Sequence, residues 1–353
     1  MNFKKELREL ILNVLTEEGS DLHISSDRHP AMRVAGQLIF LVKRDIPTKD
    51  DVIGILTEMI GKEKVDEFLK NQEIDFSYNF ENNKARLRGN AFFHGGSTSL
   101  ALRVIPSVKT LEELHLPQIL KSFSRKKQGF FLVVGPVGQG KSTTMASMID
   151  LINSERAEHI ITIEDPIEYL FEPKKSIIDQ REVGIDTDNF NNALKSVFRQ
   201  DVNVIMIGEM RGKETMATAV TAAETGHLVF STLHTNNASQ TVNRIIDSFS
   251  AGQQDQIRAQ LSNSLLGIFS QRLIPRIKGG LIPAYELLIN NNAIANLIRE
   301  KRTHEINVVI ETGFESGMID LNRSLVELVK KGEITIEDAR MNSLNIKAFE
   351  RLI

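Results

Sequence analysis

The chain has 353 residues, more than one hydrophobic core usually holds, so we expect two domains. Its 43 lysine and arginine residues and 46 aspartate and glutamate residues give a net charge of -3. This balance excludes a chain-wide attraction to nucleic acid or anionic lipid but leaves room for a local basic patch. The chain has no cysteine, which excludes disulfides and thiolate zinc sites and fits a reducing compartment.

The N-terminal stretch, MNFKKELRELILNVLTEEG, has apolar residues at helical spacing up to Gly19, which predicts a helix. Charged residues are mixed through the stretch, so we do not expect a secretory signal. No apolar run in the sequence approaches the roughly 20 residues needed to span a bilayer. The sequence therefore predicts a soluble protein in the cytoplasm.

The next part of the chain mixes strand and helix patterns. LHIS and AMRVAGQLIFLV are strand-like, and two helices are expected in residues 49–70. Three consecutive strands follow, IDFSYNF, ARLRGNAFF and SLALRVI, separated by turns at Asn82-Asn83 and Gly95-Gly96. This pattern indicates a mixed α+β unit with antiparallel strands.

From residue 129 onward, short apolar runs alternate with helical patterns. The runs are FFLVV, HIITI, VNVIMI and HLVFST, and helices are expected around 189–199, around 213–225 and from 238. Near-continuous apolar strands separated by helices indicate a parallel sheet covered on both faces. The chain is expected to be mainly helical after Tyr285.

These patterns predict an α/β protein with two domains. We expect an N-terminal α+β domain over residues 1–105 and a linker over 106–117, because a proline stands near each end of IPSVKTLEELHLP. The second domain is expected over residues 118–353, with a helical C-terminal part from about residue 290.

The stretch GPVGQGKSTTM matches the phosphate-binding pattern G-x-x-x-x-G-K-[ST]. Its glycines let backbone N–H groups surround an oxyanion, Lys141 adds a charge for the β- and γ-phosphates, and the Ser142 hydroxyl can hold Mg²⁺. A turn that contains glycine by chance is the alternative, but the stretch follows an apolar strand and precedes a helix. We expect ATP to bind to Gly135, Pro136, Val137, Gly138, Gln139, Gly140, Lys141, Ser142 and Thr143.

Acidic residues follow two other predicted strands. Glu164 and Asp165 come directly after HIITI, and Glu209 follows VNVIMI and a glycine. Ligands of open α/β sheets bind beyond the carboxyl ends of the strands, where these carboxylates fall. Such a carboxylate can orient or deprotonate a water near the γ-phosphate, or hold the waters of a magnesium ion. The alternative interpretation is solvated loop acids that pair with nearby arginines.

A third strand end, TGHLVFSTLHTN, contributes histidines. His227 begins the strand, and His234 lies just beyond it on the nucleotide side, where it could sense the γ-phosphate or position an acid. A histidine that caps a turn is the alternative. A zinc site is not expected, because cysteine is missing and the histidines lack a partner one helical turn away.

Taken together, these segments resemble the secretion and pilus ATPase superfamily, and within it the PilT-type retraction ATPases of type IV pili. GPVGQGKSTT is similar to the family's Walker A motif, TIEDPIEY to its aspartate box, IMIGEMR to its Walker B segment with the catalytic glutamate, and AAETGHLVFSTLHTN to its histidine box. SDLHIS, ARLRGNAF, LRVIPS, QREVG and GMIDLNRSL also fit, so the resemblance covers nearly the whole chain.

The resemblance implies a PAS-like N-terminal domain followed by a RecA-like ATPase domain, assembled as a homohexamer. Each ATP would lie between two domains or subunits and be approached by arginines of the N-terminal domain, for which Arg88 and Arg103 are the matching positions and Arg86 a third candidate. Arginine suits this role because its fixed charge stabilises phosphoryl transfer. A solvated sheet face is the alternative for Arg86 and Arg88, which point the same way along a strand.

Within the superfamily, the chain resembles the shorter retraction type. Assembly ATPases for pili and type II secretion usually carry a further N-terminal domain and a tetracysteine zinc motif, whereas this chain has no cysteine. The segment AIANLIRE is similar to the retraction type's AIRNLIRE, with Ala295 in place of the arginine. Gly212 replaces an acid usual after GEMR, and Val202 replaces a proline usual before the Walker B strand.

The resemblance therefore implies a hexameric ATPase that uses ATP and Mg²⁺ to retract type IV pili for twitching motility. It would act at the inner face of the cytoplasmic membrane with a pilus platform protein and, in some systems, a second retraction ATPase. The alternatives are an accessory PilU-type paralogue, an assembly ATPase, a nucleotide-binding ring that hydrolyses nothing, and a RecA-like DNA translocase. The lack of tryptophan and the slight negative charge count against the translocase and against any nucleic-acid partner.

Overall fold

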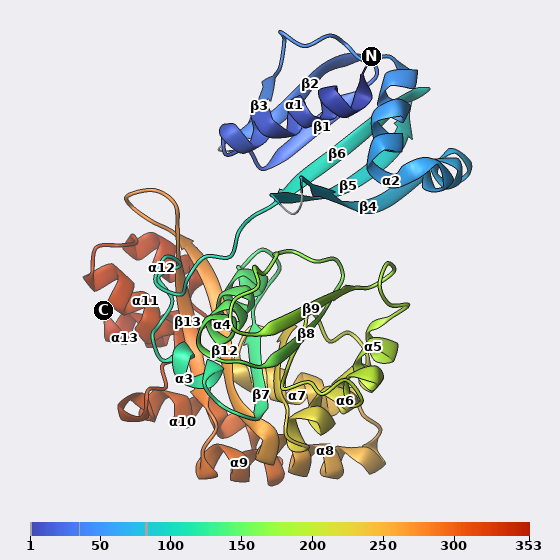
Figure 1. Cartoon of the computed structure of the whole chain (residues 1–353). Coiled ribbons are helices and arrows are strands. Elements are labelled where there is room, and N and C mark those ends of the chain that lie inside the picture. Colours follow the sequence, from blue (N-terminus) through green and yellow to red (C-terminus); the bar gives the residue numbers. More distant parts are fainter. Residues whose placement is uncertain (1, 35, 82–83) are drawn as a thin grey trace. The chain divides into compact units, whose positions relative to one another are not determined.

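The computed structural model describes residues 2–34, 36–81 and 84–353. They divide into two compact units, Met1–Ser107 and Val108–Ile353 (Figure 1). The turn expected at Asn82-Asn83, and Ala35 within an expected strand, lie outside the described residues.

The first unit is a six-stranded antiparallel sheet with two helices. Its strand order is β3-β2-β1-β6-β5-β4, and every neighbouring pair is antiparallel. Both helices pack on one face of the sheet. The elements are α1 (Phe3–Thr16), β1 (Asp21–Ser25), β2 (Arg28–Val34), β3 (Gln37–Phe40), α2 (Lys49–Asn71), β4 (Glu73–Phe80), β5 (Ala85–His94) and β6 (Ser97–Ile105).

Apolar periodicity accounts for this packing. The buried residues of α1 recur three and four positions apart, so one helix stripe faces the sheet. Residues 49–70 were expected to hold two helices, and the structure has α2 with non-helical backbone angles at Gly61, a kink where the two parts meet. In β5, alternate residues Leu87, Gly89 and Ala91 are buried towards the helices.

The second unit contains a seven-stranded sheet in the order β13-β12-β7-β11-β10-β8-β9. All neighbouring pairs are parallel except β12 and β13, which form an antiparallel hairpin. The strands are β7 (Gly129–Val134), β8 (His159–Glu164), β9 (Ile177–Glu182), β10 (Val204–Ile207), β11 (Leu228–Leu233), β12 (Leu265–Pro275) and β13 (Leu281–Ile289).

Helices cover both faces of this sheet, as the apolar runs predict. In β7, Phe130 and Leu132 belong to one hydrophobic cluster, while Phe131 and Val133 belong to another on the opposite face. The helices are α3 (Leu120–Ser124), α4 (Lys141–Glu155), α5 (Phe190–Val197), α6 (Lys213–Glu224), α7 (Ala238–Asp247), α8 (Ala251–Ser264), α9 (Asn292–Arg299), α10 (Ile306–Thr312), α11 (Leu321–Lys330), α12 (Ile336–Asn342) and α13 (Ile346–Leu352).

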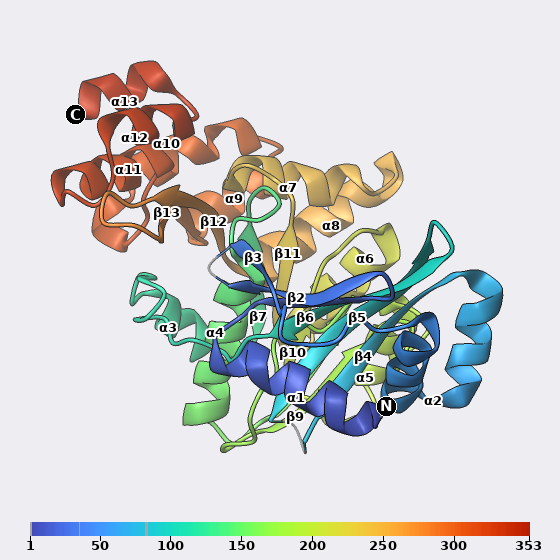
Figure 2. The same ribbon diagram turned by 90° about the horizontal axis from the view of Figure 1, so that it is seen from above.

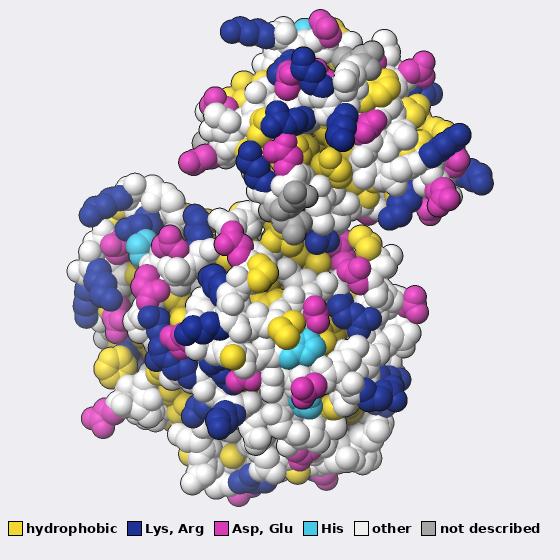
Figure 3. Space-filling view, viewed as in Figure 1, with side chains coloured by type: hydrophobic (Ala, Val, Ile, Leu, Met, Phe, Trp, Pro, Cys, Tyr) yellow, Lys and Arg dark blue, Asp and Glu magenta, His cyan; other side chains and the backbone are white. Residues whose placement is uncertain are grey.

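The C-terminal helices gather beside β13, where α11 contacts both that strand and α13 (Figure 2). The hairpin β12–β13 and the short strand β9 were not anticipated from the sequence. The segment expected as a linker is divided between the units, with Leu111 and Leu116 buried in the core of the second. Charges of both signs are interspersed over the visible face of each unit (Figure 3).

Replacing Gly89 by alanine should destabilise the first unit. Gly89 lies opposite Phe76 across β4 and β5, and an added Cβ would lie 2.2 Å from the Phe76 ring. Because the ring is buried, we expect a loss of about 1–3 kcal/mol in the free energy of unfolding, measured by urea titration.

The matched control is Gly252→Ala in α8, where an added Cβ meets no described heavy atom within 4 Å. It should be neutral or stabilising by up to about 1 kcal/mol, because alanine favours a helix. An unchanged unfolding midpoint for Gly89→Ala would show that the sheet and helices of this unit do not pack as described.

Candidate nucleotide-binding site

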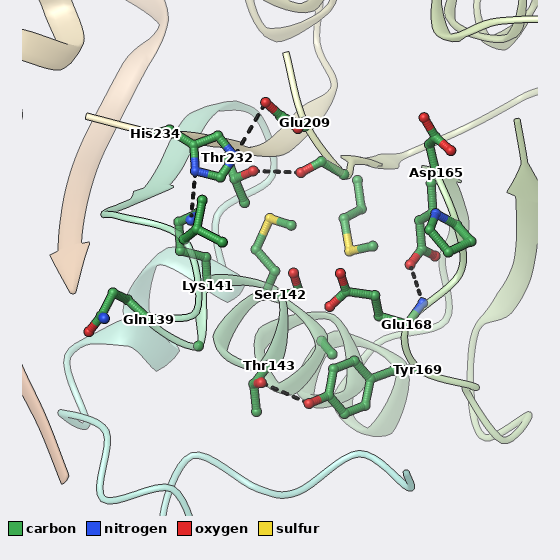
Figure 4. Close-up of a pocket in the computed structure, with 18 of the residues that line it drawn as sticks. Gln139, Lys141, Ser142, Thr143, Asp165, Glu168, Tyr169, Glu209, Thr232 and His234 are labelled. Atoms are coloured by element: carbon green, nitrogen blue, oxygen red, sulfur yellow. Dashed lines mark hydrogen bonds and ion pairs between the residues drawn. The ribbon is translucent and has the colours of Figure 1, made fainter. Parts of the chain in front are cut away.

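A cavity of about 460 Å³ opens at the carboxyl ends of the parallel strands (Figure 4). The loop after β7 forms one wall, and residues that follow β8, β10 and β11 form the rest. Since these strands run in the same direction, their carboxyl ends meet at one edge of the sheet. The cavity brings together Lys141, Ser142, Thr143, Glu164, Asp165, Glu209 and His234.

The backbone of residues 135–140 is shaped by glycine. Gly135 has φ 145°, and a Cβ there would lie 2.4 Å from the carbonyl oxygen of Gln271. Gly140 has φ 75° and is the N-cap of α4, with no side chain to occupy the first amides of the helix. These amides and the positive end of the helix dipole favour an anion at this turn.

Lys141 places a buried ammonium group at the base of the cavity. Its side chain is 7% exposed, and its Nζ donates to the carbonyl oxygens of Gly135 and Pro136 at 2.9 and 2.8 Å. Burial lowers the pKa of Lys141, while the nearby carboxylates of Glu209 and Glu168 oppose the shift. A charge held in this way is suited to a polyphosphate, which offers it a stronger partner than carbonyl oxygens.

His234 connects this ammonium group to a carboxylate (Figure 4). The Nδ1 atom of His234 lies 3.2 Å from Lys141 Nζ, and its Nε2 lies 3.3 Å from Glu209 Oε1. An ammonium can only donate and a carboxylate can only accept, so a neutral imidazole protonated at Nε2 satisfies both partners. The segments that follow β7, β11 and β10 are thereby linked through Lys141, His234 and Glu209, in that order.

Glu209 itself is held from a second side. Its Oε2 accepts a hydrogen bond from Arg211 Nε at 2.9 Å, and the Arg211 guanidinium also lies 3.8 Å from Asp165. The Thr232 hydroxyl donates to the carbonyl of Gly208 at 2.6 Å and so fixes the backbone just before Glu209. The carboxylate is thus oriented by β10, β11 and the loop after β10.

Glu164 is the most buried acid of the cavity, with 5% exposure. Its Oε1 accepts from the Thr162 hydroxyl at 2.6 Å and from Gln180 Nε2 at 3.2 Å. Burial raises its pKa to about 7, although these hydrogen bonds act in the opposite direction. Protonated and ionised forms of Glu164 are therefore both accessible near neutral pH.

Four other predicted positions belong to other elements of the chain. His227 is at the opposite end of β11 from His234, about 20 Å along the strand, and its ring contacts the Ala222 carbonyl and Phe198. Arg88 and Arg103 lie in the first unit, directly opposite each other on β5 and β6. Arg103 Nε is 2.9 Å from Asp21 Oδ1. Arg86 lies two positions before Arg88 on the same face of β5.

Sequence reasoning did not assign Tyr169 and Gln271, which also hold this site. The Tyr169 hydroxyl lies 2.7 Å from Thr143 Oγ1, and tyrosine ends the quoted TIEDPIEY segment, so its position could have suggested a role. Gln271 contacts the loop from β12, a strand that no pattern marked.

Three positions where the chain departs from the family pattern, Ala295, Val202 and Gly212, lie outside the cavity lining. Ala295 is 9% exposed on α9, and Val202 is 8% exposed in the core. Gly212 is the N-cap of α6, where no side chain caps the helix. Within the described residues, no group of three histidine, cysteine, aspartate or glutamate side chains could hold a metal ion, and none of their helices is long and apolar enough to cross a membrane.

Comparison with known proteins finds a family model and relatives that match nearly the whole chain. The family model described as "Type II/IV secretion system protein" matches residues 2–337. The chain is 44% identical to the "Twitching motility protein" of Neisseria gonorrhoeae over 90% of this chain and 84% of that one. It is 41% identical to the type IV pilus retraction ATPase PilT of Pseudomonas aeruginosa, over 95% of this chain and 97% of that one.

Among solved structures, the chain is similar to the crystal structure of the pilus retraction motor PilT with bound ADP. The TM-score is 0.91 at 44% identity, with 98% of each chain covered. The predicted fold class is confirmed: a PAS-like α+β domain followed by a RecA-like P-loop ATPase domain with a helical C-terminal part.

Replacing Glu164 by glutamine should flatten the pH dependence of stability. Burial raises the pKa of Glu164, and of Glu286 on β13, to about 7, so the folded chain binds more protons than the unfolded chain between about pH 4.5 and 7. Stability is lost as the pH rises through this window, by up to about 3 kcal/mol for each carboxyl group. Urea unfolding at about pH 5 and pH 8 should show a smaller loss for Glu164→Gln than for the wild type.

The double variant Glu164→Gln, Glu286→Gln should flatten the profile further. If Glu164→Gln lost as much stability as the wild type over this range, the carboxyl group would not be buried as described.

Proposed function

The chain belongs to the Type II/IV secretion system protein family, and from this premise we propose that it is a motor that hydrolyses ATP to retract type IV pili, withdrawing pilin subunits and so driving twitching motility. The single observation that carries the proposal is the connection from Lys141 through His234 to Glu209. It joins a phosphate cradle to a carboxylate that can activate water.

In the proposed reaction, residues 135–143, of which 137–143 line the cavity, bind the phosphates, and Lys141 neutralises their charge. Glu209 orients the attacking water and accepts its proton, because its carboxylate lies at the same cavity and is already oriented by His234 and Arg211. Glu164 supports this step as a second carboxyl group of the cavity, through water or metal. His234 contacts both Lys141 and Glu209, so in the proposal it senses whether a phosphate neutralises the Lys141 charge.

Mg²⁺ fits the donor set of the cavity. Ser142, Glu164 and Glu209 supply oxygen atoms, the ligands that this ion prefers. In the proposal the Ser142 hydroxyl holds the ion beside the phosphates, where its charge would stabilise the negative charge of phosphoryl transfer.

Arg88 and Arg103 are proposed as sensors of the γ-phosphate in a homohexamer. They are cations of the first unit on adjacent strands, and Asp21 holds the Arg103 guanidinium on the sheet. Nucleotide held between a site of the second unit and these arginines would close an interface, and hydrolysis would reopen it. Differential affinity of the closed and open interfaces for ATP and ADP is the energy source of such a motor.

The proposed partners are the platform protein of a type IV pilus and, in some systems, a second retraction ATPase. The chain would act in the cytoplasm, where ATP is supplied, bound peripherally at the inner face of the cytoplasmic membrane.

Two substitutions test the site in purified protein. Glu209→Gln keeps the shape of the side chain but removes its charge, so ATP turnover should fall by about 100-fold or more while ADP still binds. Lys141→Ala removes the cradle charge and should abolish both turnover and tight nucleotide binding. Phosphate release and calorimetric titration with ADP measure these two quantities.

The matched control is Glu214→Gln, an exposed acid in the first turn of α6, which should leave turnover unchanged. Near-normal turnover in Glu209→Gln would show that another group activates the water. A wild-type chain that binds ATP without turnover would favour the non-hydrolysing ring.

Deletion of the gene separates retraction from its alternatives. Persistent or excess surface pili without twitching are expected, since pilin would assemble but not be withdrawn. Electron microscopy and a twitching assay measure the two traits. Loss of pili would indicate an assembly ATPase. Persistent pili with residual twitching would indicate an accessory paralogue.

A further inference from the structure

We propose that the hairpin β12–β13 holds two loops of the nucleotide site in place: the phosphate loop, residues 135–140, and the histidine loop, residues 234–237. Gln271 is the positioning residue for the phosphate loop, and Glu286 is the positioning residue for the histidine loop. The inference rests on the proposed ATPase function. It concerns residues 265–289, a segment that the motifs of the nucleotide site do not include.

The place of β12 in the sheet makes this double contact possible. The strand lies beside β7, which leads into the phosphate loop, and Ser270 pairs with Val134 at the last position of β7. Successive residues of a strand point to opposite faces. Gln271 therefore faces α4 and the phosphate loop, while Ser270 faces α7 and the histidine loop.

Gln271 uses both ends of its amide on the phosphate loop. The side chain is 2% exposed, its Nε2 donates to the Gln139 carbonyl at 2.8 Å, and its Oε1 accepts from the Thr144 hydroxyl at 2.6 Å. Gln139 is held a second time, because its own Oε1 accepts from the backbone N–H of Leu273 at 2.6 Å. Gln271 thus ties both the loop before Lys141 and the first turn of α4 after it to β12.

Peptide geometry turns this contact into an orientation of the cradle. In a trans peptide the C=O of one residue and the N–H of the next point in opposite directions. By holding the Gln139 carbonyl, Gln271 directs the Gly140 N–H away from β12. The fit leaves little freedom, since a Cβ at Gly140 would lie 2.9 Å from Gln271 Nε2.

The histidine loop is held by groups of the same hairpin. The Ser270 hydroxyl donates to the Asn236 carbonyl at 2.9 Å, and the Ala238 N–H donates to Glu286 Oε1 at 2.8 Å. Glu286 pairs with Ser270 across the hairpin and is 7% exposed. These contacts fix the chain two and four positions after His234, and so hold the imidazole against Lys141 and Glu209.

The two residues should therefore affect different steps. The Gly140 amide belongs to the cradle that ADP and ATP share, so its orientation governs nucleotide binding. The His234 contact leads to Glu209, so its position governs turnover. A hairpin with only a structural role would instead lower both quantities together with stability.

The experiment compares Gln271→Met with Glu286→Met in the full chain. Gln271→Met should weaken ADP binding, measured by calorimetry, by about tenfold, and leave the turnover number at saturating ATP within about threefold. Glu286→Met should leave the Kd for ADP within about twofold and lower the turnover number by about tenfold. Glu286→Gln keeps an oxygen that can accept from Ala238 and should restore turnover.

The control for Gln271→Met is Gln254→Met on α8, whose side chain donates to the Phe249 carbonyl and does not line the cavity. Thermal unfolding of each variant shows whether it is folded at the assay temperature. A folded Gln271→Met with the wild-type Kd for ADP would overturn the proposal, as would equal losses of binding and turnover in both variants. The ADP measurement stands even if the wild-type chain hydrolyses no ATP, so it fails or succeeds separately from the proposed function.

Discussion

The buried ammonium group of Lys141 is the charge on which the site depends. Two carbonyl oxygens and one imidazole nitrogen hold it at the base of the cavity, and burial already lowers its pKa. A polyphosphate can offer this group a full negative charge at a helix N-terminus. The same imidazole reaches Glu209, so binding at the cradle and the state of the carboxylate are physically connected.

Much of this arrangement could be predicted from the sequence, because it follows from local patterns. Apolar runs separated by helices indicated the parallel sheet, and parallel strands bring their carboxyl ends to one edge. Glu164, Glu209 and His234 were therefore expected near the phosphate loop, and all of them line the cavity. His227 directly precedes β11 and His234 directly follows it, so His227 lies at the end of the strand away from the cavity.

The hairpin β12–β13 shows what local patterns miss. β12 has the sequence LLGIFSQRLIP, in which Gly267 and polar residues interrupt an apolar run. Ser270 and Gln271 are polar because each contacts a different loop. The role of Gln271 rests on contacts to residues more than 100 positions away, which no spacing rule encodes. Glu286 is likewise a buried acid whose partner, the Ala238 amide, comes from another element.

The most direct test of the account is the shortening of single, fluorescently labelled pili in living cells whose only copy of the chain carries Glu209→Gln. The account predicts that pili extend and then stay extended, because nucleotide binds at the cradle but the water is not activated. The same cells with Glu214→Gln should retract their pili at the wild-type speed. Pili that shorten at wild-type speed in the Glu209→Gln cells would contradict the claim that hydrolysis at this site drives retraction.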